Sequence, residues 1–124
     1  MSLYRVILHL GRTEDHPEGS SRCGYNFIAP LDADGHFDAD KFAESGLACT
    51  VSRFWEGQDT ENGELIRTEE GEWAFSYELG DDDDEPIVHL AQHRIVEGEY
   101  LSITEHDGVT RPFRVDAVRP LSAE

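Results

Sequence analysis

Three histidines, His89, His93 and His106, are the residues whose type and spacing best suit a metal site. Histidines four positions apart on a helix share one face and can bind one ion, as in the HExxH enzymes, but the glutamate of that motif is absent here. If residues 87–96 form a strand, His89 and His93 lie about 13 Å apart, too far to ligate one ion at roughly 2 Å. A site then needs His106, or an acid such as Glu99, to approach one of them across a hairpin. Histidines that are hydrogen-bonded or face solvent are the favoured interpretation of this pattern, and a metal-dependent enzyme with a divalent metal is the alternative.

A second set of reactive residues lies in the polar segment 11–23. Cys23 follows Arg22, and a thiol beside a cation in a polar loop can act as a nucleophile with His16 as its base, if the segment folds back. Residues 19–24 match neither the Gly-x-Ser-x-Gly elbow nor a cysteine-protease signature, so a surface loop is the competing interpretation. We expect His16 and Cys23 to belong to a ligand-binding site, because a long loop in a small domain is often functional.

Arg53 and Trp55 form the third candidate. Arginine and aromatic residues are enriched among the side chains that dominate binding interfaces. In a strand over 48–55, alternation places Phe54 on the opposite face from Arg53 and Trp55. These two residues are therefore predicted to bind a ligand or partner, with packing in the core as the alternative.

The aspartates around Gly35 are spaced like those of a calcium loop but lack its ligands. In an EF-hand with Gly35 at the glycine position, Pro30 takes the first ligand position and Lys41 takes the bidentate one. An aspartate-rich turn that leads into a helix explains the same residues. The other carboxylates are so numerous that no spacing singles out an acid–base pair for catalysis.

The charge balance restricts the class of partner. Ten lysines and arginines stand against 27 aspartates and glutamates, for a formal charge of -17. Such a surface repels phosphate backbones and anionic lipids, so we expect no direct binding of nucleic acid or membranes, and a basic protein partner or a small cationic ligand instead. An alternative is that the surface mimics nucleic acid and inhibits a nucleic-acid-binding protein. The acidic run 81–85 is interpreted as a solvated loop.

Two features predict a cytoplasmic protein. Residues 1–10 contain only a short apolar run broken by Arg5 and His9, which fits neither a signal peptide nor a membrane span. Cys23 and Cys49 form no Cys-x-x-Cys pair, which favours reduced thiols over a disulfide framework.

The elements that must position these residues are mostly strands. Residues 95–118 alternate in polarity about an Asp-Gly turn at 106–108, which predicts a hairpin. Its core-facing residues are expected to be Leu101, Ile103, Phe113, Val115 and Ala117. The same period of two predicts strands over 4–10, 24–29, 48–55, 64–68, 72–78 and 87–96. Asp38 can cap a short α-helix over 38–45 with Phe42 facing inward. We therefore predict a mainly β fold, a β-barrel or compact sandwich of about seven short antiparallel strands, in a single domain over residues 1–124.

Five segments together resemble a family of small acidic uncharacterised bacterial proteins, namely residues 24–25, 29–35, 53–55, 98–103 and 113–115. The similarity covers nearly the whole chain and consists of strand and turn patterns. It implies a bacterial origin and a single domain. The family has no assigned activity, so the resemblance assigns no catalytic residue to this chain.

The absence of an intact catalytic motif favours a non-enzymatic binding domain with an acidic surface. No cofactor is predicted for such a domain. A divalent metal belongs only to the alternative of an enzyme that uses His89, His93 or His106.

Overall fold

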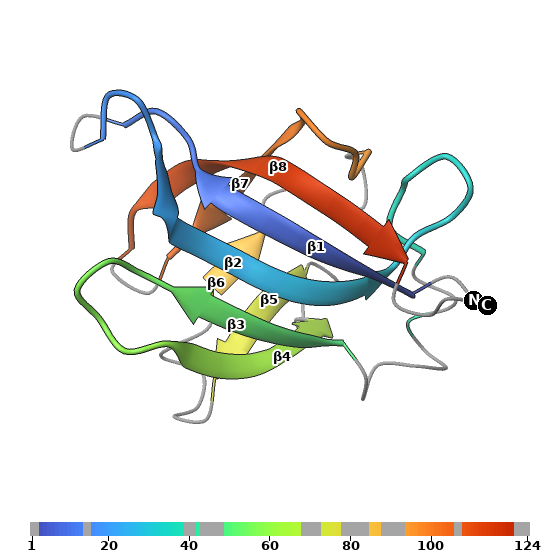
Figure 1. The fold of residues 1–124 in the computed structure, drawn as a ribbon. Helices are drawn as coiled ribbons and strands as arrows, with labels where there is room; N and C mark the ends of the chain where they lie inside the picture. Colours follow the sequence, from blue (N-terminus) through green and yellow to red (C-terminus); the bar gives the residue numbers. More distant parts are fainter. Residues whose placement is uncertain are drawn as a thin grey trace.

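The computed structural model describes residues 3–13, 16–38, 42, 49–67, 73–77, 85–87, 94–105 and 108–120. Within these residues the chain forms eight strands in one antiparallel sheet (Figure 1). They are β1 (Leu3–Leu10), β2 (Ser20–Pro30), β3 (Thr50–Phe54), β4 (Glu61–Arg67), β5 (Trp73–Tyr77), β6 (Glu85–Ile87), β7 (Tyr100–Thr104) and β8 (Thr110–Pro120). The prediction of a mainly β antiparallel fold is confirmed.

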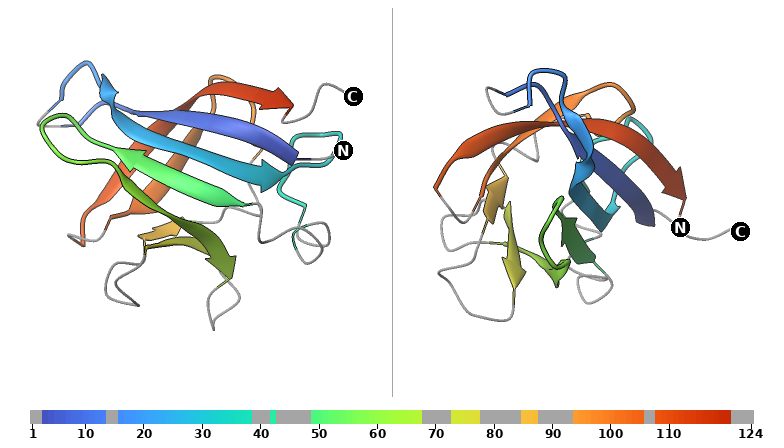
Figure 2. Two further views of the ribbon diagram at one scale, coloured as in Figure 1. Left: turned by 60° about the horizontal axis from the view of Figure 1, so that its bottom comes forward. Right: turned by 60° about the vertical axis from the view of Figure 1, so that its left-hand side comes forward.

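The sheet curls until its last strand meets its first. β8 pairs with β1, and β1 pairs with β2 along its whole length. Among the described residues, β6 has three residue pairs with β5 and one, Ile87↔Ile103, with β7. Seven strands therefore form a continuous curled sheet from β7 through β1 to β5, and the short β6 closes the barrel. Figure 2 shows β8 and β1 on one side of this barrel, with β4 and β5 on the other.

The barrel has two distinct ends. β1 begins and β8 ends at one end of the barrel, where Tyr4 pairs with Pro120, and the β1–β2 and β3–β4 connections lie at the other (Figure 1). We call the end with these two connections the hairpin end, and the opposite end the terminal end. Towards the terminal end the interior is apolar: the rings of Phe27 and Phe75 lie 5.1 Å apart, and those of Phe37 and Trp73 lie 4.4 Å apart. Each such buried side chain contributes roughly 1.5–3 kcal/mol.

The two predicted hairpins are present. β7 pairs with β8, and all five residues expected to face the core are buried. Gly108 has a φ of 84°, which glycine adopts without strain. β4 pairs with β5, as predicted for residues 64–68 and 72–78.

The short helix predicted over 38–45 is not seen as an element, and most of that range lies outside the described residues. Of its residues, Asp38 and Phe42 are described. The Phe42 N–H donates to the Asp38 carbonyl at 3.0 Å, and the Phe42 ring lies 4.7 Å from that of Trp73, in agreement with an inward orientation. The strand predicted over 87–96 is described only at its two ends. In the part of the chain that is described, no helix is long and apolar enough to cross a membrane.

Candidate binding site

The hairpin end of the barrel is filled by buried polar side chains. Tyr25 in β2, Arg53 in β3, Tyr77 in β5 and Glu85 in β6 all point inward there, and Glu105 follows directly after β7. Tyr25 and Arg53 are direct neighbours in the register of β2 and β3. All five residues are buried, and we call them the ionic cluster.

Glu105 accepts hydrogen bonds from three side chains. Its Oε2 accepts hydrogen bonds from Arg53 Nε at 3.1 Å and from the Tyr25 hydroxyl at 2.7 Å, and it lies 3.0 Å from Arg53 Nη2. Its Oε1 accepts a hydrogen bond from Arg111 Nη1 of β8 at 2.7 Å. The carboxylate is therefore held between two guanidinium groups, which offsets the cost of removing its charge from water.

Glu85 corrects the interpretation of residues 81–85 as a solvated loop. It begins β6, pairs with Phe75 and has no exposed surface. Its Oε1 accepts a hydrogen bond from the Tyr77 hydroxyl at 2.8 Å and lies 2.9 Å from the Tyr25 hydroxyl. Its Oε2 lies 3.7 Å from Arg53 Nε. These partners allow an acidic residue to occupy the interior, whereas residues 81–84 lie outside the described residues.

The surroundings keep the hydroxyls of Tyr25 and Tyr77 neutral. Burial raises the pKa of both tyrosines, and the nearby carboxylate of Glu85 raises it further. Burial alone lowers the pKa of Arg53, but Glu105, Tyr25 and Glu85 outweigh this effect and raise it. With Arg111 included, two arginines face two glutamates, so their formal charges cancel inside the barrel.

The raised tyrosine pKa predicts that the protein loses stability in alkali. Above pH 10, the ordinary value for tyrosine, the unfolded chain releases hydroxyl protons that the folded chain retains. The free energy of unfolding therefore falls as the pH rises. We expect the fall between about pH 9 and about pH 11 to be smaller in Tyr25→Phe, measured by denaturant titration. An unchanged slope in this variant would contradict the buried position of the Tyr25 hydroxyl.

The ionic cluster reaches the surface at Trp55. The guanidinium carbon of Arg53 lies 4.4 Å from the centre of this half-buried ring, and that of Arg111 lies 5.9 Å from it. Arg53 Nη1 also lies 3.5 Å from Oε1 of Gln58 and 3.5 Å from Oε2 of Glu61. The structure thus brings together two residues that were predicted to bind a ligand, with Arg53 buried and Trp55 partly exposed.

His16 and Cys23, the other two predicted binding residues, lie in different environments. Cys23 is fully buried among apolar residues. His16 belongs to a turn, where its N–H donates to Thr13 Oγ1 at 3.1 Å. Arg22 donates to Glu56 on the surface at 3.0 Å. Among the contacts of the described residues, none joins the side chains of His16 and Cys23.

Burial of both cysteines predicts that the native protein resists thiol reagents. Neither Cys23 nor Cys49 forms a disulfide, and neither has exposed surface. Burial raises the pKa of Cys49 to about 11. We expect neither thiol to react with a disulfide reagent at about pH 8 until denaturant is added. Rapid reaction of one thiol in the native protein would show that its side chain is accessible.

The three predicted metal ligands, His89, His93 and His106, lie outside the described residues. The hypothesis of a metal-dependent enzyme that uses them therefore stays a prediction.

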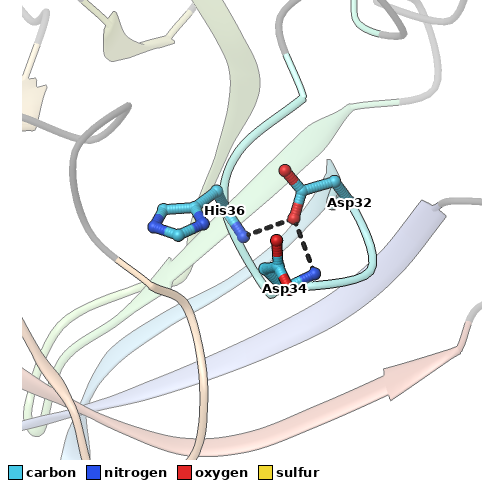
Figure 3. A group of neighbouring side chains, drawn as sticks. All are labelled: Asp32, Asp34 and His36. Carbon is cyan, nitrogen blue, oxygen red and sulfur yellow. Dashed lines mark hydrogen bonds between the residues drawn. The ribbon is translucent and has the colours of Figure 1, made fainter.

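A different group of metal-ligating residue types lies in the turn after β2. Asp32, Asp34 and His36 have ligand atoms within 4.8 Å of one another (Figure 3). Asp32 Oδ1 accepts hydrogen bonds from the N–H groups of Asp34 at 2.9 Å and His36 at 3.0 Å. Both bonds lower the pKa of Asp32, and the bond from the His36 N–H has the largest effect. Since both aspartates are exposed, the formation of a tight turn explains the grouping, as the sequence predicted around Gly35.

The sequence interpretation did not identify Tyr25, Tyr77, Glu85, Glu105 and Arg111 as site residues. The sequence does mark two of them. Glu105 lies two positions after Ile103, and Tyr77 lies two positions after Phe75, so alternation directs both side chains inward. A polar residue at an inward position is unusual and marks a candidate site. Their meeting was not predictable, because they come from three separate parts of the chain: Tyr25, then Tyr77 and Glu85, then Glu105 and Arg111.

Comparison of the chain with family models, with curated proteins and with solved structures finds no match. The resemblance to small acidic bacterial proteins stays an expectation, and the function is argued from the geometry and charge of the site.

Proposed function

We propose that this protein is a non-enzymatic binding domain whose partner is a basic protein segment, docked at the hairpin end of the barrel against Trp55. One observation carries the proposal. The charges of the buried Arg53, Glu85 and Glu105 and of the partly buried Arg111 cancel, so the other residues of the chain carry the whole formal charge of -17. A surface of that charge attracts cationic partners over a screening length of roughly 8–10 Å at physiological salt.

Trp55 gives the docking site its position. Its ring is partly exposed and packs against the guanidinium groups of Arg53 and Arg111, which restrain its orientation. The exposed carboxylates of Glu56, which also pairs with Arg22 at 3.0 Å, and of Asp59 follow it in the β3–β4 connection. An oriented aromatic ring beside carboxylates offers an apolar contact and ion pairs to a segment rich in arginine or lysine.

The state of the ionic cluster argues against a role in acid–base catalysis. General acids and bases work best when their pKa lies near the working pH. The pKa of Tyr25 and that of Tyr77 are raised far from neutrality by burial. Each glutamate of the cluster already accepts hydrogen bonds inside the barrel. A structural role beneath a binding surface fits these properties better than proton transfer.

The experiment is a titration of the protein with a fluorescently labelled arginine-rich peptide, followed by anisotropy at low and at physiological ionic strength. We expect binding that weakens as salt rises, because the attraction is between exposed charges. Trp55→Ala and the double variant Glu56→Gln/Asp59→Asn are each expected to weaken binding by about tenfold.

A matched control distinguishes a local site from general attraction to an acidic protein. Glu97→Gln/Glu99→Gln removes the same charge from exposed positions outside the β3–β4 connection, and it should change the affinity much less. Equal effects of the two double variants would reject a docking site at Trp55. Absence of binding at low ionic strength would reject the proposal as a whole.

A further inference from the structure

A pocket of about 360 Å³ lies on the outside of the barrel, between the β1–β2 connection and strands β7 and β8. Its floor contains a row of paired residues, with Tyr100 opposite Arg114 and Arg114 opposite His9. Gly11 lines one side, and its N–H donates to the carbonyl of Pro112 at 2.9 Å. A Cβ at Gly11 would lie 3.2 Å from Tyr100 Cε2, so the missing side chain lets the connection approach the ring closely.

The pocket presents both signs of charge. Arg12 and Glu18 line it from the β1–β2 connection, and neither has an ion pair with another described residue. Arg114 and Asp116 line it from β8, 4.0 Å apart, with side chains 56% and 45% exposed. His9 Nδ1 lies 3.5 Å from Asp116 Oδ2. Among the described residues, the two guanidinium groups and two carboxylates that line the pocket therefore make only one long ion pair with one another, that of Arg114 with Asp116.

Tyr100 adds an aromatic surface to these charges. It is 51% exposed and is one of the two large hydrophobic side chains exposed among the described residues. An exposed tyrosine ring can pack against a planar apolar group while its hydroxyl stays in water.

We infer that this pocket binds a small zwitterion with an aromatic group, of the class of aromatic α-amino acids. The ligand carboxylate pairs with Arg12 and Arg114, its ammonium group pairs with Glu18 and Asp116, and its ring packs on Tyr100. A chain of formal charge -17 attracts any small cation, so binding of an amine alone does not identify this pocket. Binding that requires the ligand carboxylate does, because Arg12 and Arg114 are the groups that pair with it. The pocket shares no residue with the docking site proposed at Trp55, and the inference does not rest on it.

Three probes test the inference, by calorimetry or by chemical-shift titration of the full chain. L-phenylalanine carries both charges, phenylpropionate lacks the ammonium group, and phenethylamine lacks the carboxylate. We expect L-phenylalanine to bind with a Kd of about 1 mM or tighter. Each of the other two should bind at least about tenfold more weakly.

Two variants should change these affinities in a crossed pattern. Arg114→Gln is expected to weaken L-phenylalanine and phenylpropionate by about tenfold and to leave phenethylamine unchanged. Asp116→Asn should weaken L-phenylalanine and phenethylamine and leave phenylpropionate unchanged. Both side chains are largely exposed, so neither substitution disturbs the core.

Arg119→Gln is the matched control, since this exposed residue of the same strand lies outside the pocket. It should leave all three affinities nearly unchanged. The inference is overturned if phenethylamine binds as tightly as L-phenylalanine or if Arg119→Gln acts like Arg114→Gln. Failure of L-phenylalanine to bind at millimolar concentration also overturns it.

Discussion

Replacement of Glu105 by methionine is expected to lower the free energy of unfolding by about 3–5 kcal/mol. Glu105 is 2% exposed and accepts hydrogen bonds from Arg53, Arg111 and the Tyr25 hydroxyl. Loss of its carboxylate leaves Arg53 and Arg111 without their shortest carboxylate contacts, and an uncompensated buried charge costs far more than an exposed one. Denaturant unfolding, followed by circular dichroism, measures the difference.

The control for this prediction is Glu56→Met. Glu56 also pairs with an arginine at 3.0 Å, but both side chains are largely exposed, so we expect a loss of about 1 kcal/mol or less. The double variant Arg53→Met/Glu105→Met should cost less than the sum of the two single variants, because each single change leaves an unpaired charge that the other removes. A loss in Glu105→Met as small as that in Glu56→Met would mean that the ionic cluster contributes no more than a surface ion pair.

The second large effect is expected from Phe75→Ala, which should lower the free energy of unfolding by about 3–5 kcal/mol. Phe75 is fully buried, and its ring lies 5.0 Å from that of Tyr25 and 5.1 Å from that of Phe27. The alanine leaves a cavity at the boundary between the apolar interior and the ionic cluster. The variant loses the buried area of the Phe75 ring and also the stacking contact of that ring with Tyr25.

Phe54→Ala provides the comparison for Phe75→Ala. Phe54 lies on β3 with its side chain only partly buried, so less area is lost and we expect a cost of about 1 kcal/mol. Phe75→Leu fills most of the cavity and should fall between the two. Equal costs for the alanine variants of Phe54 and Phe75 would contradict the assignment of Phe75 to the core, and urea titration of all three variants decides this.

The strand predictions succeeded where local alternation and turn chemistry agree. Residues 95–118 form a hairpin because inward apolar residues recur at every second position and Gly108 accepts a positive φ. The prediction of a solvated loop failed at Glu85, because a run of acids is normally excluded from the interior. Tyr77 and Tyr25 beside that glutamate supply the hydrogen bonding that reverses the rule. Tyr77 is eight positions from Glu85 in the chain, whereas Tyr25 is 60 positions from it.

The candidate site was predictable only in part. Arg53 and Trp55 were identified from residue type and strand parity, and they do lie together. Glu105, the partner of Arg53, is 52 positions from it, so no local pattern connects the two. Burial of Cys23 likewise depends on which residues the closed sheet places against it.

The mainly β fold, the turn at Gly35 and the net negative charge follow from local periodicity, turn residues and composition, so they could be read from the sequence. The charge balance at the hairpin end depends on the tertiary structure, because folding brings Arg53 and Arg111 to Glu85 and Glu105. The physical reason is that the cost of burying a charge is offset only by specific partners at hydrogen-bond distance. Closure of the barrel brings those partners together from five separate strands and the residue after β7.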